Sequence, residues 1–198
     1  MDIKALAQKY EPYIIERRRY FHAHPELSFK EWDTTKALVA EFEKMGMEIQ
    51  TFPDYPGLIA TLDTGKPGRT VMLRADIDAL PVKEGTGLDF ASQNEGVMHA
   101  CGHDNHMAML LGAAHILLEK KDELKGKVKF LLQSGEEMAC GAKYYVDHHI
   151  LDGVDAIYGQ HIWGTLDAPY VCVASGNRMA SCDNFTIRVK GLQSHGSA

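Results

Sequence analysis

The chain has 198 residues, of which 45% are hydrophobic and 24% are charged, so it can bury the core of a folded domain. This composition excludes an intrinsically disordered chain, and the net charge of -6 argues against the basic surface that nucleic-acid binding requires. The charged N-terminus lacks the apolar core of a signal peptide, and no apolar run is long enough to span a bilayer. We therefore expect a cytoplasmic protein with reduced cysteines and with no nucleic-acid or membrane partner.

Two helices are predicted in the N-terminal part of the chain. The first covers residues 3–22, where apolar side chains recur at helical spacing, and Pro12 predicts a kink or break near Glu11. The second covers residues 34–45, places its apolar side chains on one face, and stops at Gly46.

Three short strands and a long loop are predicted next. The strands cover residues 47–52, 58–62 and 70–74, and turns that contain Pro and Gly separate them. The loop from Asp76 to His99 is long for a compact domain, and such loops are usually functional or disordered.

The middle of the chain alternates between helices and strands. A helix with one apolar stripe is predicted over residues 107–118, a buried strand over 128–133, a short helix over 142–147 and a strand over 154–160. This alternation predicts an α/β domain with a mixed, mostly parallel central sheet flanked by helices.

The last residues follow a different pattern. Residues 184–190 alternate between apolar and polar side chains, which predicts a half-exposed antiparallel strand. We therefore assign residues 1–182 to the α/β domain and residues 183–198 to the start of a second domain. So short a remnant cannot form a domain, so we expect a truncated chain.

The segment from His99 to His106 is the densest group of potential metal ligands. Cys101 and His103 supply thiolate and imidazole, which both bind divalent ions well, and Gly102 between them permits a sharp turn. Alone, this pattern is also compatible with an ordinary helix start capped by Asp104.

Further polar side chains follow the predicted strands. Glu136 and Glu137 come after one strand, where one carboxylate can bind an ion while the other accepts a proton from water. His161 ends the last strand, and Asp76 and Asp78 follow an earlier one, where they can orient ligands. Each is ordinary alone, as a solvated turn or a surface histidine, but their convergence at one rim of a sheet predicts a metal site.

Other reactive side chains have simpler interpretations. A thiol hydrolase built on Cys101 is a possible alternative, although it has no use for paired carboxylates. We expect His115 to be packed. The remaining expectations are a solvated face for Arg17–Arg19, His22 and His24, exposure for His148 and His149, and burial for Cys140, Cys172 and Cys182.

Taken together, these segments resemble the M20 metallopeptidase family, and most closely its amidohydrolase branch. The matching segments are His24–Ser28 with Glu31, Leu73–Glu84, Met98–His106, Gln133–Glu137, Gly141–Ala142 and Gly159–His161. The resemblance implies a catalytic domain like that of the zinc exopeptidases. It also implies that residues 183–198 begin an α+β lid and dimerisation domain.

The resemblance also implies roles for individual residues. It makes Cys101, His103, Glu137 and His161 ligands of two divalent ions, and Glu136 the general base. His195 matches a histidine that helps to hold the substrate carbonyl. We expect Asp76 to support the ligands, and the ligand types suit zinc or manganese, with cobalt or nickel as alternatives.

Two departures from the family pattern stand out. The chain reads Gln133-Ser134-Gly135-Glu136-Glu137 where the family usually has Gln-Pro-Ala-Glu-Glu. The last metal ligand of the family, a distant histidine, would fall beyond residue 198.

The function implied is metal-dependent hydrolysis of the amide bond of N-acyl amino acids, such as acetyl or benzoyl derivatives. The products are a carboxylic acid and a free amino acid, and the whole protein is expected to be a homodimer. The alternatives are a dipeptidase, an N-acetyl-diaminopimelate deacetylase, and an inactive metal-binding fragment.

Overall fold

The computed structural model describes residues 2–182 and 185–197. The chain divides into two compact units, Met1–Gly164 and Thr165–Ala198, and the sheet and the long helices all belong to the first. None of the helices in the described residues is long and apolar enough to cross a membrane.

The helices of the first unit agree with the predicted ones except at Pro12. Helix α1 is continuous across Pro12, because both Pro12 and Gln8 are exposed and water can satisfy the carbonyl that the proline leaves unpaired. The helices are α1 (Ile3–Ala23), α2 (Trp32–Lys44), α3 (His103–Glu119) and α4 (Gly141–Asp147), with a 3-10 turn, η1, at Lys121–Glu123.

Five strands form one sheet in the order β1-β2-β4-β3-β5. The strands are β1 (Glu48–Phe52), β2 (Tyr55–Asp63), β3 (Thr70–Asp76), β4 (Lys127–Gln133) and β5 (Ala156–Gly159). Strand β3 is parallel to β4 and β5, while β2 is antiparallel to β1 and β4. The sheet is mixed, as predicted, but only two of its four strand pairings are parallel, and the short β1–β2 connection makes one of the antiparallel pairs a hairpin.

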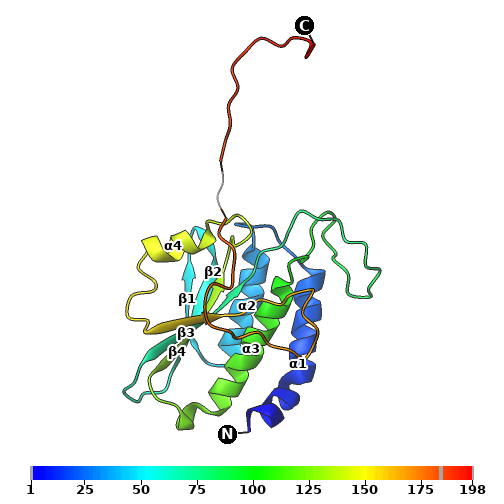
Figure 1. Cartoon of the computed structure of the whole chain (residues 1–198). Helices are drawn as coiled ribbons and strands as arrows, with labels where there is room; N and C mark the ends of the chain where they lie inside the picture. Colours follow the sequence, from blue (N-terminus) through cyan, green and yellow to red (C-terminus); the bar gives the residue numbers. More distant parts are fainter. Residues whose placement is uncertain (1, 183–184, 198) are drawn as a thin grey trace. The chain divides into compact units, whose positions relative to one another are not determined.

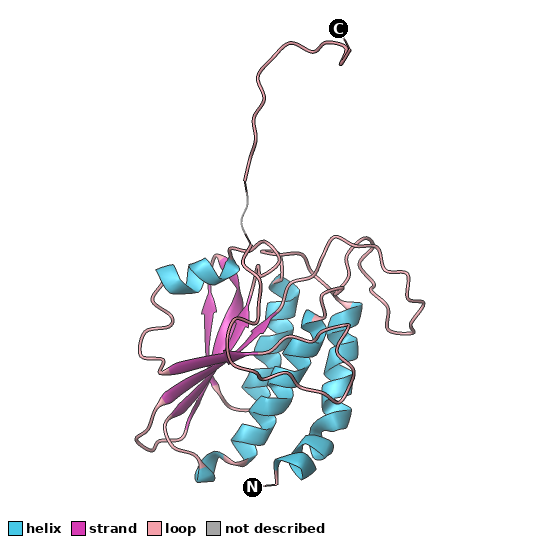
Figure 2. Cartoon of the chain, in the orientation of Figure 1, coloured by secondary structure: helices cyan, strands magenta, loops and turns pink. Residues whose placement is uncertain are grey.

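Helices cover both faces of the sheet, and each face has its own apolar core. Figure 2 shows α1, α2 and α3 on one face and the short α4 on the other. The larger core lies under the three long helices and includes Phe42, Met107 and Phe130. The smaller core lies under α4, where Tyr145 packs with Phe52 and its neighbours.

This topology brings several chain segments to one edge of the sheet. Strands β3 and β4 run parallel and end together, with Asp76 opposite Gln133. Helix α3, green in Figure 1, starts at His103 beside this edge, and the residues that follow β5 bring His161 Nε2 within 3.4 Å of Cys101 Sγ. The segments that carry the predicted ligands are therefore neighbours in space.

The strand predicted over residues 184–190 is not formed in the described part of that segment. Phe185, Ile187 and Val189 are 84%, 77% and 87% exposed, and residues 185–190 have no ladder partner among the described residues. A strand needs a neighbour for its backbone hydrogen bonds, and alternation alone cannot supply one. Asn184 lies outside the described residues.

Candidate metal centre

His103 is the centre of the candidate site. It is fully buried at the start of α3, and its Nδ1–H donates to the backbone oxygen of Asp78 (2.8 Å) and to its carboxylate (3.2 Å). The other ring nitrogen, Nε2, lies 3.6 Å from Glu136 Oε2 and 3.8 Å from Glu137 Oε1. Asp76 Oδ1 is 3.7 Å from the same nitrogen. These separations are too long for hydrogen bonds.

The predicted ligands gather in overlapping groups that all contain His103. Each group has ligand atoms that lie within 4.8 Å of one another. Cys101 Sγ and His161 Nε2 are 3.4 Å apart, and the groups are Cys101-His103-His161, His103-Glu136-Glu137 and Asp76-His103-His106. The structure therefore brings together every residue predicted as a ligand, together with Glu136 and Asp76.

Two buried ligand atoms at this site are unpaired. Within the described residues, His103 Nε2 and Glu137 Oε1 have no hydrogen-bond partner. An unpaired buried polar atom costs about 1–3 kcal/mol, so native structures rarely leave two of them side by side. A cation between the imidazole and the carboxylate would satisfy both atoms, so the residues present fit a divalent metal ion.

The charges around His103 also fit a cation. Burial opposes protonation of His103, but the hydrogen bond to Asp78 and the charge of Asp76 raise its pKa to about 8. Burial, and next the charge of Glu137, raise the pKa of the Cys101 thiol to about 12. A divalent ion would reverse that preference, because a coordinated thiol loses its proton.

Asp78 and Asp76 orient different histidines. Asp78 holds His103 and also accepts a hydrogen bond from the Glu137 backbone N–H (2.9 Å), so it ties two predicted ligands together. Asp76 instead bonds to His106 Nδ1 (2.5 Å) and to the Arg74 guanidinium (2.7 Å). The group that orients His103 is therefore Asp78.

A buried carboxylate supports the turn that presents Glu136 and Glu137. Glu31 accepts hydrogen bonds from the Ser134 hydroxyl (2.8 Å) and from the Gly135 N–H (3.1 Å). Gly135 has φ +71, and a Cβ there would lie 2.2 Å from the Phe29 ring, so the turn requires glycine. Burial raises the pKa of Glu31 to about 7.

Two expectations for other residues were wrong, and the alternative in which Asp104 caps α3 is not found. His22 is buried, because its two ring nitrogens pair with Asp104 (2.7 Å) and Glu84 (3.1 Å). Asp104 is accordingly part of this network, and Gly102 occupies the N-cap of α3. The cysteines expected to be buried are exposed, because they lie outside the packed elements: Cys140, Cys172 and Cys182.

Three of the other histidines lie where the sequence predicted them, and a fourth belongs to the second unit. His115 packs between Tyr10 and Tyr13, with ring centroids 5.0 and 4.6 Å away, and His148 and His149 are exposed. His195 belongs to the second unit, where its Nδ1 contacts the Ser197 hydroxyl (2.7 Å). Its role at the substrate stays a prediction.

Three roles at the site were not assigned from the sequence, although each residue lies in a segment that the sequence singled out. They are the roles of His106 and Glu31 and the specific pairing of Asp78 with His103. His106 follows His103 by three positions on one helix, so it lies on the same face, and this spacing could have identified it. No local pattern connects Glu31 with Ser134, because the two are 103 positions apart.

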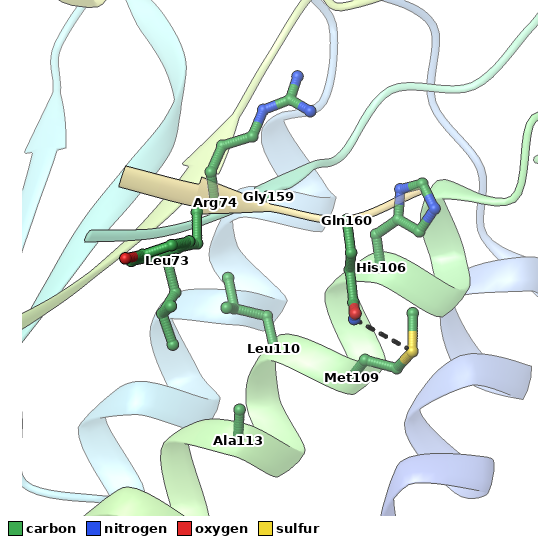
Figure 3. A pocket seen from close by; sticks show the side chains of 9 residues that line it. Leu73, Arg74, His106, Met109, Leu110, Ala113, Gly159 and Gln160 are labelled. Atoms are coloured by element: carbon green, nitrogen blue, oxygen red, sulfur yellow. Dashed lines mark hydrogen bonds between the residues drawn. The ribbon is translucent and has the colours of Figure 1, made fainter. Parts of the chain in front are cut away.

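A small, mostly apolar cavity flanks the site. It measures about 220 Å³ and lies where β3, the edge strand β5 and α3 meet, as Figure 3 shows. Gln160 closes one side through a contact of its amide nitrogen with Met109 Sδ (3.3 Å). His106 also lines this cavity, so it lies between the cavity and the candidate ligands.

Comparison with known proteins places this site in a family. The chain is 41% identical to the N-acyl-L-amino acid amidohydrolase of Geobacillus stearothermophilus, over 99% of this chain and 53% of the relative. It is also 41% identical to thermostable carboxypeptidase 1 of Saccharolobus solfataricus, over 99% of this chain and 51% of the relative. The chain thus spans about half the length of the curated relatives that it matches.

Structure and family comparisons agree with these relatives. The crystal structure of the Bacillus subtilis YXEP protein, described as a dinuclear metal-binding peptidase of the M20 family, matches with a TM-score of 0.75 and 43% identity. The match covers 82% of this chain and 45% of that one. The model of peptidase family M20/M25/M40 matches residues 72–190, which include the whole candidate metal centre. The chain therefore belongs to peptidase family M20/M25/M40.

Proposed function

We propose that this chain carries the metal-binding half of an amidohydrolase that cleaves the amide bond of N-acyl amino acids. The observation that carries the proposal is the pair of unpaired buried ligand atoms, His103 Nε2 and Glu137 Oε1, which lie 3.8 Å apart. The M20 family and the amidohydrolase relative support the reaction class.

Four residues would hold two divalent ions: Cys101, His103, Glu137 and His161. Asp78 prepares His103 for this role, because its backbone oxygen accepts a hydrogen bond from Nδ1–H, which leaves Nε2 as the ligand atom. Bound divalent ions supply Lewis acidity, which lowers the pKa of water and polarises a carbonyl. Thiolate, imidazole and carboxylate together suit zinc or manganese, with cobalt or nickel as alternatives.

Glu136 is the proposed general base. Its side chain is 38% exposed, so water can reach it, whereas the side chain of the neighbouring Glu137 is only 17% exposed. Glu136 would accept the proton of the attacking water and return it to the leaving amine. His195 would contact the substrate carbonyl in the assembled enzyme.

The test combines metal content with turnover. We expect about two ions per chain by elemental analysis, fewer in Cys101→Ala, and hydrolysis of N-acetyl or N-benzoyl amino acids by the metal-loaded protein. Glu136→Gln should keep the metal and lose roughly 10²–10⁴-fold in turnover. The matched control is Glu43→Gln on an exposed face of α2, which should change neither quantity.

Two results would contradict the proposal. A chain that binds no divalent ion has no metal centre of this kind, and an active Glu136→Gln variant would remove Glu136 from the mechanism. These measurements are separate, so the metal site and the role of Glu136 can fail independently.

A peptidase is the second candidate, and the carboxypeptidase relative favours it. Dipeptides and N-acetyl-diaminopimelate, tested beside acetyl and benzoyl amino acids, distinguish these substrates. Metal binding without hydrolysis of any of them would identify a metal-binding fragment. A homodimer and a cytoplasmic location remain predictions for the whole protein.

A further inference from the structure

His161 reaches the candidate metal centre on a segment without regular secondary structure. It follows β5 directly, and its Nε2 lies 3.4 Å from Cys101 Sγ. Its Nδ1 contacts the carbonyl oxygen of Ile162, which leaves Nε2 as the ligand atom. A ligand on such a segment needs contacts that fix the backbone, because a helix or a strand does not do so here.

His106 supplies one of these contacts. The backbone N–H of Ile162 donates to His106 Nε2 (3.0 Å). Because Nε2 accepts, Nδ1 carries the proton and donates to Asp76 Oδ1 (2.5 Å). Asp76 is itself held by Arg74 (2.7 Å). Both nitrogens of this buried ring are therefore used in hydrogen bonds.

The side chain of Ile162 supplies a second contact. It packs on Gly102, where an added Cβ would lie 2.3 Å from Ile162 Cδ1. Gly102 separates Cys101 from His103, so Ile162 connects the segment that carries His161 to the turn that carries two other ligands. Figure 3 shows His106 on the first turn of α3, beside the segment that leaves β5 through Gln160.

We propose that His106 is a positioning residue that holds His161 at the metal centre by accepting the N–H of Ile162, while Asp76 fixes its ring. This inference rests on the metal centre proposed above. In this proposal His106 is not itself a metal ligand, although its ring lies close enough to His103 and Asp76 to form one of the ligand groups with them.

Three substitutions test the two hydrogen bonds of His106 one at a time and together. His106→Gln keeps an acceptor for the Ile162 N–H and loses the donor to Asp76. His106→Asn keeps a donor for Asp76 and loses the acceptor, and His106→Leu loses both. The matched control is His115→Gln, on the same helix but packed against tyrosines away from the site.

The readout is zinc affinity, measured by competition with a chelator. Zinc affinity should fall about 10–100-fold in His106→Asn and His106→Leu, as for other groups that orient a metal ligand. It should stay within a few-fold of the unsubstituted chain in His106→Gln and His115→Gln. In the metal-free chain, amide exchange of Ile162 should speed up in the Asn and Leu variants only.

Each other result has a definite meaning. If the unsubstituted chain binds zinc and His106→Leu binds it equally well, the positioning role is wrong and the metal centre stands. Equal weakening in all three variants would make His106 itself a ligand and would also overturn the inference. No binding by the unsubstituted chain would overturn the metal centre and this inference together. If His106→Leu fails to fold, the Gln and Asn variants decide.

Discussion

His103 and His22 are both buried histidines beside carboxylates, but only one of them has an unpaired ring nitrogen. His22 uses both nitrogens, one on Asp104 (2.7 Å) and one on Glu84 (3.1 Å), and Arg18 adds a positive charge 3.0 Å from Asp104. His103 uses only Nδ1, and its Nε2 faces carboxylate oxygens at 3.6–3.8 Å.

The difference separates a structural network from a metal centre. Both ring nitrogens of His22 have a carboxylate partner, so its hydrogen bonds are complete without any further group. Around His103, several carboxylates converge on a single imidazole, and two atoms are left unpaired among the described residues. Histidine beside acid is therefore insufficient to identify a metal site, whereas unpaired ligand atoms at ligand spacing are informative.

The largest expected effect comes from removing the histidine with the unpaired nitrogen. His103→Ala should weaken zinc binding by about 100–1000-fold, because zinc sites bind with ~10–16 kcal/mol shared among about four ligands. His103 also belongs to every ligand group at the site. Chelator competition measures the change, and near-normal affinity would place the ion elsewhere.

Replacing His22, whose two ring nitrogens are both hydrogen-bonded, should lower stability and leave zinc binding unchanged. His22→Ala removes two hydrogen bonds to buried carboxylates, each worth about 2 kcal/mol, so we expect a loss of about 4 kcal/mol in the free energy of unfolding. Zinc affinity should not change. Urea unfolding and chelator competition on the same protein give both values, and a large loss of zinc affinity would break the comparison.

Replacing Glu31 should have a smaller effect, which is a change in the free energy of unfolding that depends on pH. Its pKa in the folded chain is raised to about 7 from an ordinary value of 4.5, so its stabilising contribution is complete below pH 4.5 and is lost as pH rises through 7. Glu31→Gln should therefore gain stability relative to the unsubstituted chain between pH 5 and pH 8, by up to about 3 kcal/mol. Urea unfolding across this range gives the difference, and a constant difference would mean that Glu31 ionises normally.

The smallest effect is expected from replacing Cys140, an exposed cysteine that follows Glu137 by three positions. Cys140→Ser should change stability by less than about 0.5 kcal/mol and leave the zinc content unaltered, because Cys140 is exposed and belongs to none of the ligand groups. Cys101→Ser is the matched variant and should lower the zinc content. A fall in zinc with Cys140→Ser would add this thiol to the site.

Much of the fold could be predicted from local patterns. The apolar stripe of α3 and the apolar runs of β3 and β4 identified these elements, because burial imposes a period of 3.6 on helices and continuous apolar runs on internal strands. The prediction erred at Pro12 and over residues 185–190. In both places the outcome depends on surroundings, namely exposure of the helix face in the first case and a missing strand partner in the second.

The sequence by itself determined which residue types stand at the ends of the elements: Cys101 and His103 at the start of α3, Glu136 and Glu137 after β4, and His161 after β5. Only the tertiary structure decided how these side chains pair. In the folded chain Asp78 bonds to His103 and Asp76 bonds to His106. His22 is buried against Asp104, and Glu31 accepts a hydrogen bond from the turn that precedes Glu136. Residue type and local spacing are properties of the chain, but a hydrogen bond between residues far apart in sequence exists only where packing brings its donor and acceptor together.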